Sequence, residues 1–423
     1  MNRLLCGIGA GLMLASVGVA HADPWSFGGH LKLQLSQSYY RSDDLAALYA
    51  GREPTDSNLD FRLKAERHQG PWETIVHYEI LGVGGDSLSA NRALAAIYPI
   101  LGAGVSADGL PNDKRRLLDL TETLTDANRS AAVQRLDRLS LGYLGENDVI
   151  RVGRQAVSWG DGLVFNPMDI FNPFSPVAID KEYKTGDDMV YGQRLFASGA
   201  DLQAIVLPRR NPASGRVEGD QSSYALKYRC QVSGADLNLL GAHHFGENLL
   251  GAGWVQNVGG AVWRTDVVVT ELEMGGHATS AVTNADYSWT AFGRNWYGYV
   301  EYFRNGFGET NSANYLTPNA ELAARIGRGE LYTLGRDYLA AGFRVESTPL
   351  VNIYAGLIRN LHDASGYFQP RIVYDWQENL QLMVGLSLPF GARGSEFGGI
   401  PVSTGGPYIT PAKTVYVRAG YYF

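Results

Sequence analysis

Apolar and polar residues alternate along this chain with a period of two, and this alternation constrains the fold more than any other feature of the sequence. Successive side chains of a β-strand point to opposite faces, so each alternating segment predicts a strand with one apolar and one polar face. We call the alternate residues that share one face of a strand a parity. Residues of the apolar parity include Leu31, Leu33 and Leu35; Leu59, Phe61 and Leu63; Tyr224, Leu226 and Tyr228; Ile372, Tyr374 and Trp376; and Val415, Val417 and Ala419.

The strands predicted from this pattern run to about ten residues, which is the length of a membrane-crossing β-strand. Short turns and long polar segments alternate between them. The short turns lie near 68–70, 145–147, 233–234, 348–349 and 377–379, and the long segments are 84–134, 159–186, 305–336 and 391–411. Outer-membrane barrels separate short turns and long loops to opposite ends, whereas a soluble β-sandwich has no reason to do so. The sequence therefore predicts an all-β, antiparallel transmembrane barrel with long extracellular loops.

The alternating segments give eighteen strands, an even number as in single-chain bacterial barrels, with sixteen as the alternative. The predicted strands are 27–40, 57–69, 71–83, 135–145, 147–158, 187–197, 200–208, 221–232, 235–245, 249–259, 261–273, 284–293, 295–304, 337–347, 350–361, 366–376, 380–390 and 412–423. The pair between 187 and 208 and the region 249–293 alternate least regularly.

The two ends of the chain carry signals of export. Arg3, an apolar stretch over 4–20 and the sequence Ala20-His21-Ala22 predict a removable signal peptide over 1–22, which leaves 23–423 as the barrel. The last strand ends at Phe423, and this resembles the C-terminal signature that the barrel-assembly machinery recognises. Lipid and lipopolysaccharide of a Gram-negative outer membrane are then the expected surroundings.

Composition excludes several classes of function. Removing Arg3 from the 36 Lys and Arg residues leaves 35 against 43 Asp and Glu residues, so the net charge changes from −7 to −8 and nucleic acid is disfavoured as a partner. Only Cys230 remains after Cys6 leaves with the signal peptide, so no intramolecular disulfide is expected. No HExxH, Walker A, CxxC or GxSxG motif occurs, and we expect no catalytic residue, metal or cofactor.

The polar parity of the strands predicts which charges face the lumen, because each unpaired charge facing hydrocarbon costs roughly 2–4 kcal/mol near the midplane. The predicted pore-lining residues are Lys32, Arg62, Lys64, Glu66, Arg138, Arg154, Arg194, Lys227, Arg229, Arg264, Arg344, Arg371 and Arg418. The acidic members of the same parity are Glu66, Glu73, Glu79, Asp188, Asp201, Asp236, Asp266, Glu301, Glu346 and Asp375. The two signs nearly balance, and many of these charges can pair across neighbouring strands.

Two long segments differ from ordinary surface loops. Segment 159–186 carries apolar residues that need burial, so we expect it to fold inward and narrow the pore; packing over the rim or against a partner is the alternative. Its charges, which would meet the solute, are Asp161, Asp169, Asp180, Lys181, Glu182 and Lys184. Segment 84–134 reads as an outer loop, with helix-like charge spacing over 113–135 that predicts a short helix.

The strand before segment 159–186 breaks the alternation, since Arg151 and Arg154 have opposite parity and Gly153 between them suggests a bulge. The motifs Gly153-Arg154-Gln155, Trp159-Gly160-Asp161 and Asn166-Pro167 and the run FNPFSP resemble Gram-negative barrels of the porin-like and alginate-export type. The resemblance implies a lumenal role for Arg154, a loop-anchoring role for Asp161, and anionic or saccharide solutes. The near balance of lumenal charge argues against alginate itself.

These features together predict an outer-membrane channel for passive or facilitated passage of small hydrophilic solutes, and its partner would be a small hydrophilic or saccharide solute. An export conduit for an exopolysaccharide and a plugged structural or adhesive barrel are the alternatives. Four tyrosines on the lumen parity, Tyr297, Tyr299, Tyr354 and Tyr416, could stack on sugars, although aromatic girdles facing the headgroups are the commoner use of such residues. The oligomeric state stays open.

Overall fold

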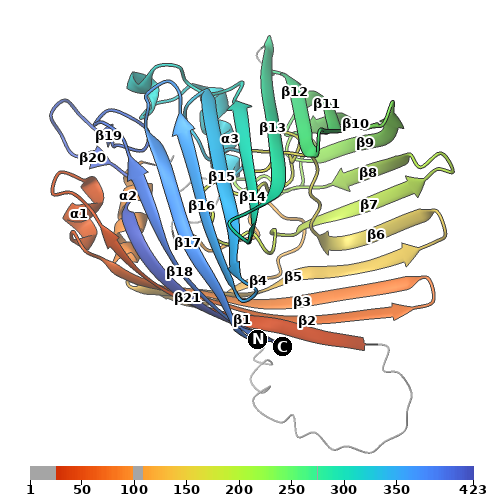
Figure 1. Cartoon of the computed structure of the whole chain (residues 1–423), viewed down its shortest axis with the longest axis horizontal. Coiled ribbons are helices and arrows are strands. Elements are labelled where there is room, and N and C mark those ends of the chain that lie inside the picture. Colours follow the sequence, from red (N-terminus) through yellow and green to blue (C-terminus); the bar gives the residue numbers. More distant parts are fainter. Residues whose placement is uncertain (1–24, 99–107, 274) are drawn as a thin grey trace, which may run out of the picture.

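The computed structural model describes residues 25–98, 108–273 and 275–423, and they form one closed β-barrel (Figure 1). Nineteen strands share a single sheet. The strands of the barrel wall are β1 (Trp25–Tyr39), β2 (Thr55–Gln69), β3 (Trp72–Gly85), β5 (Ser130–Leu144), β6 (Asp148–Gln155), β7 (Asp187–Leu195), β8 (Asp201–Leu207), β9 (Ser223–Val232), β10 (Ala235–His244), β11 (Glu247–Val258), β12 (Ala261–Glu271), β13 (His277–Ala291), β14 (Arg294–Arg304), β15 (Asp337–Thr348), β16 (Val351–Asn360), β17 (Gly366–Gln377), β18 (Leu380–Phe390) and β21 (Lys413–Tyr422). The predicted signal peptide over 1–22 lies outside the described residues.

Eighteen of these strands close the wall, because β4 (Thr121–Ala127) pairs with β5 alone while β3 and β5 pair directly. Each strand is antiparallel to its neighbours, and β1 pairs with β21 from His30↔Tyr422 to Tyr39↔Lys413. This seam closes the wall of eighteen strands upon itself. The prediction of an eighteen-stranded antiparallel barrel is confirmed, and the alternative of sixteen is not.

Aliphatic side chains point outward and charged side chains point inward. Leu33 and Val417 on the outer face are half exposed, at 51% and 50%, although they belong to regular strands. Lys32, next to Leu33 in β1, is 5% exposed and lies inside. This distribution is the reverse of a soluble protein, and it fits a wall whose outer face is solvated by acyl chains.

The helices of the described ranges all belong to connections between strands, at the end of the barrel opposite the start of β1 and the C-terminus (Figure 1). They are α1 (Leu45–Ala50), α2 (Ser87–Ile97), the 3₁₀ helix η2 (Ser312–Asn314) and α3 (Ala320–Arg328), and a small hairpin of β19 (Ile400–Pro401) and β20 (Tyr408–Ile409) accompanies them. No helix in the described ranges is long and apolar enough to cross a membrane. Among the described residues, the end where β1 begins and β21 stops has only short turns, whereas the other end has both long loops and short turns such as 245–246.

Two expectations about local structure are wrong. Segment 84–134 does hold a short helix, but it is α2, and the stretch 113–135 instead forms β4 and the start of β5. Its charges recur at helical spacing, yet the run from Thr121 to Ala127 is rich in β-branched threonine and pairs with an available strand edge. Strand β13 also begins at His277, seven residues before the predicted position 284, because small residues there hide the alternation.

Candidate functional site in the barrel lumen

The long connection between β6 and β7, residues 156–186, folds into the barrel and is called the inner loop below. The prediction that its apolar residues are buried is largely confirmed, since Phe165, Ile170 and Phe171 are buried and Met168 is inaccessible to solvent. Leu163, Val164 and Phe174 are partly buried. Trp159 packs edge-on against Phe171, in an apolar cluster that includes residues of β7, β8 and β10 to β12. Apolar burial therefore draws the loop against the inner wall.

The first half of the inner loop is fixed by carboxylates of the wall that accept main-chain N–H groups. Asp266 of β12 accepts from the N–H of Asp161 at 2.7 Å, and Asn238 of β10 donates to the Asp161 carboxylate at 3.0 Å. Glu301 of β14, which is 1% exposed, accepts the N–H groups of three consecutive residues at 2.6, 3.0 and 2.7 Å. These three residues are Leu163, Val164 and Phe165. The arrangement satisfies donors that would otherwise be buried without partners.

The second half of the inner loop is fixed by cations of the wall. Lys32 of β1 donates to Asp180 at 2.8 Å and to Glu182 at 2.5 Å, and Arg418 of β21 donates to Asp180 at 2.9 Å. The guanidinium of Arg62 in β2 stacks over the ring of Tyr183 with its central carbon 4.3 Å from the ring centroid. Opposite charge thus ties this half to the seam where the barrel closes.

The anchors follow the order of the strands around the barrel. From the start of the inner loop to its end, the contacts come from β8, β12, β14, β17, β1 with β21, β2 and finally β5. In β8, Gln203 accepts from the indole of Trp159. In β17 and β5, Gln369 and Arg138 donate to the carbonyls of Val177 and Lys184. The inner loop therefore lies against the wall along most of its circumference.

Most of the loop charges expected to meet the solute instead hold the loop in place. Asp169 and Lys184 form a buried ion pair, and Asp180 and Glu182 are paired with Lys32. Asp161, for which the resemblance implied an anchoring role, bonds Asn238 as described above. Lys181 is exposed and donates only to the carbonyl of Pro176 in the described part of the chain. Lys181 is the loop charge that remains available to a solute.

The lumen face holds most of the predicted pore-lining residues, although the contacts of several are with the protein. They are Lys32, Arg62, Lys64, Glu66, Arg138, Lys227, Arg229, Arg264, Arg344, Arg371 and Arg418. Arg62 lies beneath the inner loop and is almost fully buried, and Arg229 and Arg264 pair with Asp236 and Asp286. The tyrosines on this parity also lie inside rather than in a lipid-facing girdle: Arg371 stacks over Tyr354 at 4.4 Å.

Arg194 does not face the lumen. It shares its parity with Val190 of β7, which is exposed on the outer face, and it pairs with Asp148. Both side chains of this pair are about half exposed and lie near the short-turn end of the barrel. A charge near the membrane interface costs roughly 0–1 kcal/mol, so an outward-facing pair is tolerated there.

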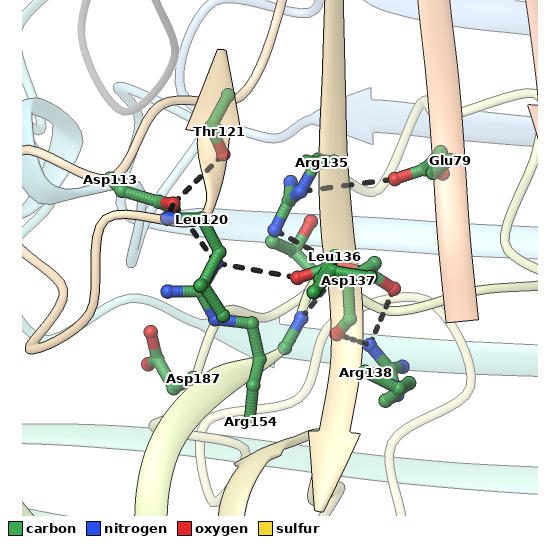
Figure 2. A network of polar contacts seen from close by, with 12 residues as sticks. Glu79, Asp113, Leu120, Thr121, Arg135, Leu136, Asp137, Arg138, Arg154 and Asp187 are labelled. Carbon is green, nitrogen blue, oxygen red and sulfur yellow. Dashed lines mark hydrogen bonds and ion pairs between the residues drawn. The ribbon is translucent and has the colours of Figure 1, made fainter. Parts of the chain in front are cut away.

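Arg154 is buried and does not line the pore; it belongs to a network of polar contacts with Asp113 (Figure 2). It is fully buried and donates to Asp188 at 2.9 and 3.0 Å, to Asp113 at 2.9 Å and to the carbonyl of Leu118 at 2.7 Å. Asp113 also accepts from the main chain of Leu120, so Arg154 fixes the segment that leads into β4. The bulge predicted at 153 is absent: the β5–β6 and β6–β7 ladders are continuous, and Gly153 changes direction through a φ of 120°.

Two buried charges of β5, Arg135 and Asp137, are missing from the sequence-based list of lumenal residues. A register shift opposite His77 and Tyr78 leaves Asp137 of β5 without a cross-strand partner in the ladder. This bulge lets Arg135, Asp137 and Arg138 all contact the interior. Asp137 pairs with Arg135 at 3.2 Å (Figure 2) and with Arg62 at 2.9 Å. The available signal was the sequence Arg135-Leu136-Asp137-Arg138, in which two charges of one parity meet a third of the other.

No group of three His, Cys, Asp or Glu side chains in the described ranges could hold a metal ion. Neither a protein-family model nor a curated protein sequence matches the chain. Solved structures do match. Acinetobacter baumannii OccAB3 is 11% identical with a TM-score of 0.53, covering 94% of this chain and 99% of that one. A BenF-like porin from Pseudomonas fluorescens Pf-5 is 10% identical with a TM-score of 0.51, covering 94% and 98%.

A third similar structure belongs to a barrel described in different terms. Wzi is described as an outer-membrane protein involved in group 1 capsule assembly in Escherichia coli and as a carbohydrate-binding β-barrel. It is 8% identical with a TM-score of 0.51, and the match covers 95% of this chain and 84% of that one. Likeness at these identities concerns the fold, so the chain has the architecture of Gram-negative outer-membrane barrels of the porin-like type.

Proposed function

We propose that this protein is a Gram-negative outer-membrane channel through which small hydrophilic solutes pass, with the inner loop setting the width of the lumen. The proposal rests on the series of hydrogen bonds between Trp159 and Lys184 that hold the inner loop against strands around the barrel. Eighteen strands enclose an aqueous channel unless loops fill it. A loop fixed against the wall would narrow this channel and select solutes by size and charge.

The location in the outer membrane is supported by the outer face of the wall. Apolar side chains such as Leu33, Leu226 and Val417 are exposed there and require lipid. The signal peptide expected over 1–22 would export the chain, and Phe423 would be recognised during assembly. Lipid and lipopolysaccharide are then the neighbours of the outer wall.

A plugged barrel that binds saccharide is the second candidate function. The many hydrogen bonds of the inner loop favour it, since a loop held this firmly could also block the lumen. The stacked pair of Tyr354 and Arg371 offers an aromatic and cationic surface inside the barrel. Wzi, with a similar fold, is described as carbohydrate-binding. The two functions differ in whether ions cross the barrel.

Conductance in a planar bilayer separates these functions. Protein folded in detergent and added to the bilayer should give discrete current steps, and liposomes that contain it should swell in small neutral sugars faster than in large ones. The Glu301→Gln variant, in which the first half of the inner loop is released, should conduct more than the wild type. If neither protein gives current steps although both migrate as folded, heat-modifiable barrels, the channel proposal is wrong and the plugged barrel is favoured.

A further inference from the structure

A cavity of about 370 Å³ lies in the mouth of the barrel at the long-loop end. Its walls come from segments that are distant in the sequence: 111–116 before β4, 170–175 of the inner loop, Arg209 after β8, and Arg328 at the end of α3. Because the inner loop forms one wall, a molecule in this cavity is next to the narrowed part of the lumen. Lys184, an inner-loop residue that bonds the carbonyl of Val157, also reaches the cavity.

Three guanidinium groups surround a single aromatic ring in this cavity. The guanidinium carbons of Arg328, Arg209 and Arg115 lie 4.5, 4.7 and 5.9 Å from the centroid of the Phe245 ring. Phe245 occupies the turn between β10 and β11 with a φ of 49°, a backbone conformation that aromatic residues rarely adopt. Residues in such conformations persist where the surrounding structure holds them, and they concentrate at binding sites.

The position of Arg115 is set by main-chain contacts and not by a counter-ion. The carbonyl of Arg115 accepts from the N–H of Arg210 at 2.9 Å, which places it beside Arg209. The Arg115 guanidinium donates to the neutral side chain of Gln221 at 3.1 Å and forms no ion pair with a described carboxylate. Burial together with the nearby Arg328 and Arg209 lowers the pKa of Arg115. Like charges are therefore held close together without full compensation.

The carboxylates that line the cavity are too few for its cations. Asp187 is shared by Arg209 at 2.8 Å and Arg116 at 3.3 Å, and Arg116 also pairs with Asp113 at 3.1 Å. Glu330 is bonded to Arg328 at 2.6 Å, so Arg115 is the cavity arginine that pairs with no described carboxylate. The exposed Lys114 beside Arg115 adds a further positive charge. Although the charges of the whole lumen nearly balance, this site at the mouth carries an excess of positive charge from Arg115 and Lys114. A bound anion would supply the missing negative charge.

We propose that this cavity binds a small multivalent oxyanion, a molecule that carries two or more carboxylate or phosphate groups, on its way to the inner loop. Guanidinium groups bind such oxygens through paired N–H donors, and three of them from different segments can contact separate acidic groups of one solute. The ring of Phe245 keeps the guanidiniums apart and oriented through cation–π contacts. This inference names the solute class of the channel proposed above and rests on that function for its physiological meaning.

Calorimetric titration of citrate into the folded protein in detergent at low salt tests the site. The wild type should bind citrate saturably and should not bind glucose, and the affinity should fall as salt is added. Arg115→Gln removes one guanidinium without leaving a buried carboxylate unpaired, and it should weaken citrate binding at least tenfold. Arg194→Gln is the matched control: it makes the same charge change at the opposite end of the barrel and should leave the affinity unchanged.

A second variant tests the ring. Phe245→Asn keeps a residue that accepts positive φ but removes the aromatic platform, so it should weaken citrate binding several-fold while preserving the turn. Heat-modifiable migration of each variant reports whether the barrel is folded. Equal affinities of Arg115→Gln and Arg194→Gln, or the absence of saturable citrate binding to the wild type, would refute the proposal.

Two further comparisons separate failure of the oxyanion site from failure of the channel. Titration measures binding without conduction, so a protein that binds citrate but gives no current steps supports the oxyanion site while overturning the channel. The phosphates of lipid A share the same chemistry, and detergent-dispersed lipid A serves as a second probe. If lipid A binds in an Arg115-dependent manner and citrate does not, the site belongs to a membrane lipid and the assignment to a soluble solute is wrong.

Discussion

Replacing Glu301 by glutamine should release the first half of the inner loop. Glu301 accepts main-chain N–H groups of Leu163, Val164 and Phe165, and hydrogen bonds to charged groups contribute about 1.5–3 kcal/mol each, against about 0.5–1.5 kcal/mol for neutral pairs. The glutamine oxygen can keep two of these bonds at neutral strength, but its NH₂ group then faces the third donor. Two weakened bonds and one buried unsatisfied N–H cost roughly 3–5 kcal/mol together.

A cost of this size shifts the local opening equilibrium of the loop by about two to three and a half powers of ten, since 1.4 kcal/mol is tenfold. Hydrogen exchange of the amides at 163–165, followed by mass spectrometry, should accelerate by that factor in Glu301→Gln. Glu346→Gln is the control, because it makes the same substitution on an exposed carboxylate near the short-turn end, bonded only to Asn295 among the described residues. Unchanged exchange at 163–165 together with unchanged single-channel conductance would refute this account of how the inner loop is held.

Three other changes test further parts of the structure. Arg62→Met leaves the carboxylates of Glu79 and Asp137 buried without this partner, and it should lower the free energy of unfolding by about 3–5 kcal/mol in urea titrations in micelles. Burial raises the pKa of Glu396, in the loop before β21, to about 7, above its ordinary value of 4.5, so the docking of this loop should be strongest below pH 4.5 and weaken as the pH rises through 7; protease sensitivity of the loop at pH 5 and 8 measures this. Deleting Phe423 removes two main-chain hydrogen bonds to β1 at the seam and should reduce the heat-modifiable, assembled fraction in membranes.

Each of these changes has a matched control. Arg194→Met removes an arginine from an exposed pair worth about 0–1 kcal/mol, and a loss for Arg62→Met no larger than for this variant would contradict the buried network. Glu396→Gln should show no pH dependence beyond that of the protease itself. Phe423→Ala keeps the two main-chain bonds, so a defect equal to that of the deletion would show that the aromatic ring, and not the seam, matters.

The strands could be predicted from the sequence because lipid imposes a single rule over the whole length of each strand. Leu31, Leu33 and Leu35 must face acyl chains, and residues between them must face water, so the period of two survives in almost every strand. It fails at 277–283, where small residues fit either face. The inward fold of the inner loop could also be predicted from the sequence, because exposing residues such as Phe165 and Phe171 to water raises the free energy of the folded protein.

The details of the site depend on contacts between distant segments, which alternation does not encode. Arg154 does not line the pore because the segment around Asp113, 41 residues earlier in the chain, covers it. Asp137 enters the interior through one extra residue in a ladder, a shift that reverses the parity after it. The arginines around Phe245 come from three separate connections, so their meeting requires the closed barrel.

Passage of ions along the inner loop is tested most directly by a cysteine at position 181, whose native lysine is exposed within the lumen. In a Cys230→Ser background, Lys181→Cys channels in a planar bilayer are treated with a charged methanethiosulfonate reagent. If solutes cross the lumen past this loop, the single-channel current should drop in discrete steps as the thiol reacts. If mass spectrometry shows complete labelling while the current stays constant, ions do not pass the inner loop and the proposed channel function is contradicted.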